Sequence, residues 1–339
     1  MPRAPSLQDR SRISENSSTA PVRKPATLAD MNSTAKGVGF LVLAVLTTSL
    51  QSVAIKWLGG SYSALEIVVI RSLVALPFTL LFYRSEGRSK NGGVLPTTQH
   101  RKLEYTRGLF LFLSYTTAVM GLAALPLADV EAIRFSGPLM ITFLSVIILG
   151  ERVGPRHWLA LLVGFCGVLL VVRPGSTAFD LGSVFILVSV LFYALMVIST
   201  RKLHMYDSSA TMAYYSSLVY LVAALLLAPL PLVVGARPDA HPSIAFLIRP
   251  WTMPAPLDLA VMAGLGLVWA AWIYFLSRAY SLAEASVLAP FEYVALPISI
   301  MWGFLIWHEV PTLMTLAGAM LTLASGLYIF YRTRGSSKA

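Results

Sequence analysis

Cysteine and charge are both scarce in this chain. The single cysteine, Cys166, lies inside an apolar run, which excludes a disulfide framework and a cysteine-based metal site. The five histidines are scattered without the spacing of metal ligands, so we predict no metal and no cofactor. Charged residues make up only 12% of the chain, about half the share that a soluble protein carries.

The chain also lacks the short motifs of ATP-driven and hydrolytic proteins. It has no phosphate-binding loop of the form GxxxxGK[ST], so it encodes no ATP-driven machinery. It has no HExxH, no GxSxG and no paired-aspartate motif, which makes an intramembrane enzyme the least favoured class. We therefore assign no catalytic residue and expect no enzyme.

Hydrophobic residues are what the chain has in abundance. They form 56% of the 339 residues, and the mean hydropathy is +0.71. Ten apolar runs each approach the ~20 residues that a helix needs to cross ~30 Å of hydrocarbon. The predicted spans are 38–57, 64–83, 107–125, 129–149, 157–173, 181–200, 211–234, 257–277, 283–306 and 312–331. Helices are expected because lipid cannot satisfy open backbone groups, so the fold predicted is an all-α polytopic membrane protein with ten transmembrane helices.

Basic residues set the expected orientation. With the N-terminus inside, the outer segments hold only Lys56, Arg173, Arg237 and Arg249 among 26 lysines and arginines. The basic loop 84–106 is then cytoplasmic, and the positive-inside rule places both termini in the cytoplasm of a cell (inner) membrane. The net charge of +10 marks a membrane face, so no nucleic-acid partner is predicted.

The second half of the chain repeats features of the first. Matching residues at a nearly constant offset are Gly37, Phe40, Val45, Leu46, Lys56 and Leu58 with Gly182, Phe185, Val190, Leu191, Arg201 and Leu203. Each copy holds five spans, an odd number, so the copies are predicted to insert in opposite orientations, as in many transporters. The predicted organisation is a disordered cytoplasmic tail (1–36), repeat 1 (37–174), repeat 2 (175–332) and a short cytoplasmic tail (333–339).

Two stretches carry a resemblance to a known family. ADVEAIRFSGPL…LGERV followed by WLALLVGFCGVLLVVRPG resembles the first EamA repeat of the drug/metabolite transporter superfamily. AEASVLAPFEY…HEVPT followed by LAGAMLTLASGLYI resembles the second, with His308 where the family has glycine. The resemblance covers about residues 37–332. It implies inverted five-plus-five repeats and alternating access around a central cavity, for substrates such as amino acids, S-adenosylmethionine, riboflavin and nucleobases.

Glu292 is the first candidate for a substrate-binding or coupling residue. It lies about nine residues into the span 283–306, roughly 13 Å from the cytoplasmic end, where an unpaired carboxylate is most costly. It could bind a cationic group, relay a proton or form a structural pair. The nearby aromatic residues Tyr293 and Trp272 could stack on a planar or cationic substrate, although such residues more often pack or face lipid.

Three other charged residues inside predicted spans are candidates for the site. Glu131 and Arg134 are three residues apart on one helix face, so they could pair with each other. Alternatively, Arg134 could extend outward to the membrane surface or meet Glu292 across the repeat interface. Arg71 lies about 10 Å from the outer end of its span, and could be a gate, a carboxylate clamp or a structural tie between helices.

Prolines and small residues complete the pattern. Pro138, Pro290 and Pro297 are predicted to break the two equivalent spans near the site, because each removes a backbone donor. Gly318, Thr322 and Gly326 form a small-residue face that predicts close helix packing.

These observations predict a secondary transporter that moves a small, amino-acid-like metabolite, S-adenosylmethionine among the candidates, by alternating access. The expected partners are the substrate, the lipid bilayer and protons as a coupling ion, and a homodimer stays open. The alternative class is a channel or a non-transporting membrane receptor, although charges concentrated in three spans argue against a channel.

Overall fold

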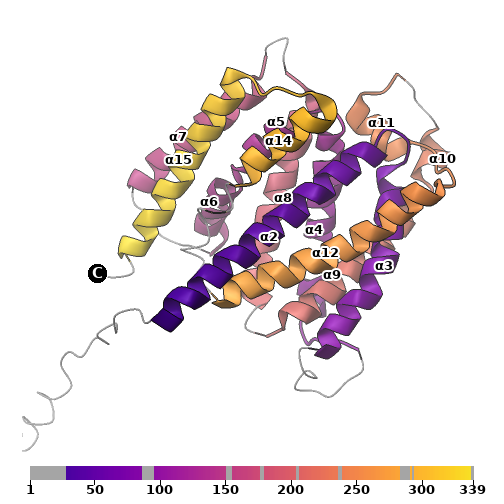
Figure 1. Cartoon of the computed structure of the whole chain (residues 1–339), viewed down its shortest axis with the longest axis horizontal. Helices are drawn as coiled ribbons and strands as arrows, with labels where there is room; N and C mark the ends of the chain where they lie inside the picture. Colours follow the sequence, from indigo (N-terminus) through magenta and orange to yellow (C-terminus); the bar gives the residue numbers. More distant parts are fainter. Residues whose placement is uncertain are drawn as a thin grey trace, which may run out of the picture.

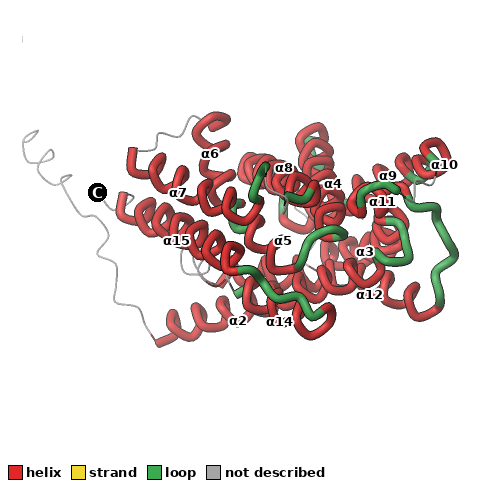
Figure 2. The backbone as a smooth tube through the Cα atoms, turned by 90° about the horizontal axis from the view of Figure 1, so that it is seen from above, coloured by secondary structure: helices red, strands yellow, loops and turns green. Residues whose placement is uncertain are grey.

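The computed structural model describes residues 28–85, 95–149, 155–175, 179–203, 206–235, 239–282, 291 and 294–336. Across these residues the chain is helical and contains no strand, as Figure 2 shows. The helices are α2 (Leu28–Leu58), α3 (Ala64–Ser85), α4 (Arg101–Leu122), α5 (Leu127–Arg134), α6 (Gly137–Leu149), α7 (Pro155–Val172), α8 (Leu181–Leu203), α9 (Ser209–Leu227), α10 (Leu230–Val234), α11 (Pro242–Ile248), α12 (Pro256–Leu282), α14 (Ala295–Trp307) and α15 (Leu313–Ser336). The all-α prediction is confirmed.

Helices coincide with the predicted spans, with several differences. α2 begins at Leu28, inside the segment 1–36 predicted as a disordered tail, and the span 211–234 is divided between α9 and α10. The first part of the span 283–306 lies outside the described residues, and α14 covers its second part. α4 begins at Arg101, before the third predicted span and inside the segment assigned to the basic loop. Five described helical stretches are long and apolar enough to cross a membrane: Ala35–Leu58, Ala64–Leu81, Leu127–Ile148, Leu181–Thr200 and Ala210–Val234.

The fourth span is broken, as Pro138 predicted. α5 ends at Arg134 and α6 begins at Gly137, with Phe135 and Ser136 between them. Pro138 has no N–H to bond the carbonyl four residues before it, and its fixed φ suits the first turn of a new helix. Ser136 reconnects the backbone locally, since its hydroxyl donates to the Ile133 carbonyl at 2.6 Å.

Pro297 also stands at a helix beginning. It is the third residue of α14, where a backbone N–H would have no partner within the helix. A proline there costs no intrahelical hydrogen bond. Pro290, the remaining predicted break, lies outside the described residues.

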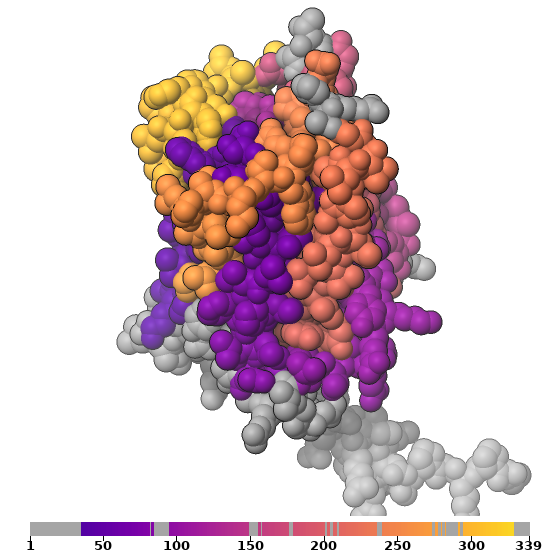
Figure 3. All heavy atoms as spheres, turned by 90° about the vertical axis from the view of Figure 1, so that its right-hand side faces the viewer, coloured from indigo at the N-terminus to yellow at the C-terminus, as the bar shows by residue number. Residues whose placement is uncertain are grey.

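The helices pack in a pattern that is nearly unchanged when the two halves of the chain are exchanged. α4 packs along α8, and α2 packs along α12. α3 contacts both α9 and α12, and α4 also contacts α9. Figure 3 shows one face of the molecule, on which α3 lies between α9 and α12. α7 and α15 form a further pair, which Figure 1 shows side by side.

The α7–α15 contact is close because small residues face each other. A Cβ on Gly318 would lie 2.5 Å from the Gly167 carbonyl oxygen, and one on Gly167 would lie 2.5 Å from the Thr322 hydroxyl. The Thr322 hydroxyl lies 3.3 Å from the Gly164 carbonyl oxygen, across the helix pair. The prediction that Gly318 and Thr322 mediate close packing is confirmed.

Large apolar side chains cover the outside of the bundle. Leu162, Leu226 and Leu305 are each at least 60% exposed, each on a helix within a predicted span. In water such a surface would cause aggregation, whereas in a bilayer it faces lipid tails. The chain is a multi-pass membrane protein.

Candidate functional site

Arg71 is the most deeply buried basic residue in the described part of the bundle. It lies on α3 with 2% of its surface exposed. Three aromatic rings from three other helices surround its guanidinium carbon: Tyr115 on α4 at 4.1 Å, Trp269 on α12 at 5.0 Å and Tyr220 on α9 at 5.2 Å. Each ring presents electron-rich faces that attract a cation, so the four helices meet around this one charge.

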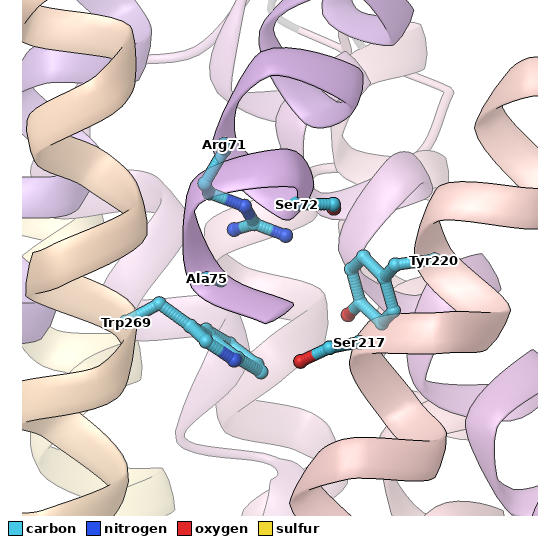
Figure 4. A pocket seen from close by; sticks show the side chains of 6 residues that line it. All are labelled: Arg71, Ser72, Ala75, Ser217, Tyr220 and Trp269. Atoms are coloured by element: carbon cyan, nitrogen blue, oxygen red, sulfur yellow. The ribbon is translucent and has the colours of Figure 1, made fainter. Parts of the chain in front are cut away.

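A small polar cavity opens beside the guanidinium. Its lining consists of Arg71, Ser72, Ala75, Ser217, Tyr220 and Trp269. Figure 4 shows the guanidinium in the space between Tyr220 and Trp269, with the Ser217 hydroxyl near the indole. The free volume is about 10 Å³, which is room for one water molecule. The cavity is therefore closed around its charged group and has to widen to admit a metabolite.

Backbone packing explains why Trp269 reaches Arg71. A Cβ on Gly266 would lie 2.8 Å from the Arg71 carbonyl oxygen and 2.8 Å from the Val74 Cβ, so α12 lies directly against α3. Trp269 follows Gly266 by about one helical turn and so stands over the same stretch of α3.

Tyr220 is held from the opposite side of the cavity. Its hydroxyl donates to the Leu111 carbonyl of α4 at 2.8 Å, and its ring packs edge-on against Phe112 with centroids 5.6 Å apart. Both contacts fix α9 against α4. The ring over Arg71 is therefore positioned by a hydrogen bond and by packing.

The charge of Arg71 is not neutralised by an acid in the described part of the chain. No ion pair there includes Arg71, and its Nη1 is buried without a hydrogen-bond partner of normal geometry. The Ser217 hydroxyl is buried without a partner as well. A buried cation is costly unless it is compensated, and three rings supply only part of that compensation. Such a site can bind an anionic group, because a guanidinium offers a carboxylate two parallel hydrogen bonds.

The structure places the other predicted residues in three ways. Trp272 stacks on Trp269 with ring centroids 5.1 Å apart, behind the cavity wall. Arg134 pairs with Glu131 on its own helix at 3.0 Å and does not line the Arg71 cavity. The pair within one helix is therefore present, and the contact of Arg134 with Glu292 stays a prediction, because Glu292 lies outside the described residues. Glu292 and Tyr293 lie outside the described residues.

Four lining residues were not singled out from the sequence: Ser72, Ala75, Ser217 and Tyr220. Ser217 and Tyr220 lie three residues apart within the apolar span 211–234, on the face of α9 that meets α3 and α4. The signal was present, because residues 216–220 read Ser-Ser-Leu-Val-Tyr inside an otherwise apolar run.

A second charged group joins helix ends at one side of the bundle. Lys56, at the end of α2, forms an ion pair with Glu309, just after α14. The Lys56 ammonium also donates to the Leu125 carbonyl at 3.0 Å, and the Leu127 N–H donates to the other Glu309 oxygen at 3.0 Å. The Trp307 ring lies 5.0 Å from the ammonium. This end cluster (Lys56, Leu125, Leu127, Trp307 and Glu309) ties α2, α14 and the start of α5 together.

Comparison with known proteins identifies the family. Residues 35–173 match the EamA-like transporter family. The pseudopaline exporter CntI of Pseudomonas aeruginosa is 30% identical over 302 residues, which cover 88% of this chain and 97% of that protein. The chain belongs to the EamA-like transporter family. It is a membrane protein of the drug/metabolite transporter superfamily, and its function is the transport of a small metabolite, as predicted.

Other relatives of this chain transport different compounds. The S-adenosylmethionine uptake transporter of Rickettsia felis is 27% identical, over 87% of this chain and 92% of its own. The riboflavin transporter of Rhizobium johnstonii is 26% identical, over 86% and 90% respectively. A solved crystal structure with 14% identity shares the fold, with a TM-score of 0.57 over 87% of this chain and 96% of its own.

Proposed function

We propose that this EamA-family protein transports a small metabolite with an amino-acid carboxylate across the inner membrane by alternating access. S-adenosylmethionine is the first compound to test. The observation that carries the proposal is Arg71: a buried guanidinium with an unpartnered Nη1 in an aromatic cavity. The opposite charge, which no described residue supplies to this cavity, would come from the substrate.

The cavity suits both ends of such a molecule. A carboxylate would accept two charge-assisted hydrogen bonds from Arg71, each worth about 1.5–3 kcal/mol. The rings of Trp269 and Tyr220, which line the cavity, offer faces for stacking with a planar base or for attraction to a cationic sulfonium. Names of relatives support the same class, since four Rickettsia relatives are S-adenosylmethionine uptake transporters.

The repeat organisation is part of the proposal. If repeats 37–174 and 175–332 insert in opposite directions, α2 corresponds to α8 and α4 corresponds to α12. Exchanging the repeats then turns the α4–α8 contact into the α2–α12 contact, and both contacts are present. Both termini would lie in the cytoplasm. The end cluster around Lys56 and Glu309 would then lie at the outer face. It would hold that side closed and would open when the substrate exchanges there.

Uptake by purified protein in liposomes tests the substrate and Arg71 together. Wild type is expected to transport S-adenosylmethionine more efficiently than decarboxylated S-adenosylmethionine, because only the former offers Arg71 a carboxylate. Arg71→Met is expected to lower kcat/KM for S-adenosylmethionine by about 10- to 100-fold, the equivalent of one charged hydrogen bond, and to remove the preference for the carboxylated compound. Arg71→Lys keeps the charge but cannot donate two parallel hydrogen bonds, so its kcat/KM should lie between those of wild type and Arg71→Met.

Arg156→Met is the matched control, because Arg156 is exposed at the start of α7. It removes a positive charge without touching the cavity and should leave transport unchanged. Wild-type preference for S-adenosylmethionine that survives in Arg71→Met would contradict the role of Arg71. A wild-type protein that moves neither compound, but moves riboflavin, would contradict the substrate class.

A further inference from the structure

A fully buried acid lies at the end of α4 that is opposite to the end cluster. Glu104, in the first turn of α4, has none of its surface exposed. Both of its carboxylate oxygens are buried, and neither accepts a hydrogen bond from a donor in the described residues. The nearest charged partner is Arg107, whose Nη1 lies 3.7 Å from Glu104 Oε2. That separation is an ion pair too long to be a hydrogen bond.

The group that faces Glu104 is a second acid. Asp207, in the turn between α8 and α9, lies within hydrogen-bonding reach of the Glu104 carboxyl group. Thr98 already donates a hydrogen bond to Asp207 Oδ2 at 2.6 Å. Two carboxyl groups can share a hydrogen bond only when one of them holds a proton. Glu104 is fully buried and Asp207 is only partly buried, so we assign the shared proton to Glu104.

Electrostatics agree with the geometry. Glu104 precedes the apolar span 107–125, and burial is the main cause that raises its pKa to about 7. Asp207 raises the pKa further, and Arg107 opposes both effects. A carboxyl group with a pKa in this range gains and loses its proton across the pH range of a cell.

The remaining neighbours of Glu104 do not supply a second base. Tyr215 on α9 faces the acid and donates to the Pro96 carbonyl at 3.3 Å, and Arg101 lies exposed one turn before it. α8 contributes the neutral Thr200, which accepts a hydrogen bond from Arg107 Nε at 2.9 Å. Among the described residues, the charges that face this acid are thus Arg107 and Asp207.

Arg107 connects this acid to the Arg71 cavity. Its Nη1 donates to the Met212 carbonyl at 3.0 Å and to the Ser216 hydroxyl at 2.8 Å, both on α9. Ser216 adjoins Ser217, which lines the cavity, and Tyr220 follows one turn later. When Glu104 loses its proton, the attraction of Arg107 to Glu104 increases, which competes with the bonds that Arg107 makes to α9.

From these contacts we infer that Glu104 and Asp207 form a proton-binding site that couples substrate movement to the proton gradient. The inference rests on the proposed function and adds the coupling ion and its location. Protonation of Glu104 neutralises one buried acid, and leaves Arg107 bound to α9. Deprotonation weakens that link, so the two protonation states favour different positions of α9 relative to α4.

Infrared titration of the purified full-length protein tests the site without any substrate. The absorption of a protonated carboxyl group should disappear as the pH rises through about 7. It should be missing in Glu104→Gln, which resembles the protonated acid and preserves the fold. In Asp207→Asn the midpoint should move to lower pH, because the neighbouring charge that raises the pKa is gone. A titrating band that persists in Glu104→Gln would overturn the assignment.

Transport in liposomes tests the coupling. Wild type should accumulate labelled S-adenosylmethionine when a pH gradient is imposed, and should also exchange it between equal pools without a gradient. Glu104→Gln should retain exchange and lose the gradient-driven accumulation. Gradient-driven accumulation at the wild-type level in Glu104→Gln would overturn the inference. A wild-type protein with no exchange would instead contradict the proposed substrate, and the infrared result would then decide on the proton site.

Discussion

Neutralising Glu309 is expected to loosen one end of the bundle by a measurable amount. Glu309→Gln keeps the shape of the side chain but removes the charge that pairs with Lys56 and accepts from the Leu127 N–H. The side chains of Lys56 and Glu309 are 13% and 20% exposed, between a surface pair and a fully buried one. Exposed pairs contribute about 0.2–1 kcal/mol, and breaking a buried pair costs about 3–5 kcal/mol. We therefore expect Glu309→Gln to lower the free energy of unfolding by about 1–3 kcal/mol.

A double-mutant cycle isolates the contact. Lys56→Met should cost a similar amount, and the double variant should cost less than the sum, with an interaction energy of about 1–2 kcal/mol. The assay is reversible unfolding of the purified protein in mixed micelles with increasing detergent denaturant. Lys102→Met, which removes an exposed charge on α4, is the matched control and should be neutral. An interaction energy below about 0.3 kcal/mol, the ordinary error of additivity, would refute the tie between these helix ends.

Three further outcomes are expected. Gly318→Ala should destabilise the protein by about 1–3 kcal/mol through overpacking, whereas Gly264→Ala, whose Cβ meets nothing within 4 Å, should be neutral or slightly stabilising in the same unfolding assay. Trp269→Ala should raise the KM for a carboxylated substrate about tenfold, and Trp269→Phe should give a KM between those of wild type and Trp269→Ala. Equal KM values for the two variants would contradict stacking. In a chain whose native cysteine is replaced by serine, a cysteine at Asp239 should react with an impermeant reagent added outside cells, and one at Lys102 should be protected.

The sequence allowed prediction of what depends on local chain properties. The helix break at Pro138 follows from the missing N–H of one residue, and the Glu131–Arg134 pair follows from a spacing of three residues on one helix. The family could be predicted because its motifs are continuous in sequence.

The Arg71 cavity could be predicted only in part. Arg71 stood out as a charge deep in a span, but its three rings come from α4, α9 and α12, and their meeting depends on how helices pack side by side. Helices that are apolar all round give no periodic signal for which face meets which neighbour. Glu104 was assigned to a loop for a related reason: basic residues flank it, and the first polar turn of α4 reads like a connection.

The break between α5 and α6 divides one membrane crossing between two sets of neighbours. α5 packs mainly against α14 and also contacts α15 and α8, whereas α6 packs mainly against α8. A continuous helix is stiff, so a change in its tilt at one membrane surface would also move its end at the other surface. Two short rods joined at Phe135 and Ser136 do not transmit bending in this way. The two parts of this span can therefore rearrange independently, α5 together with the end cluster and α6 together with α8.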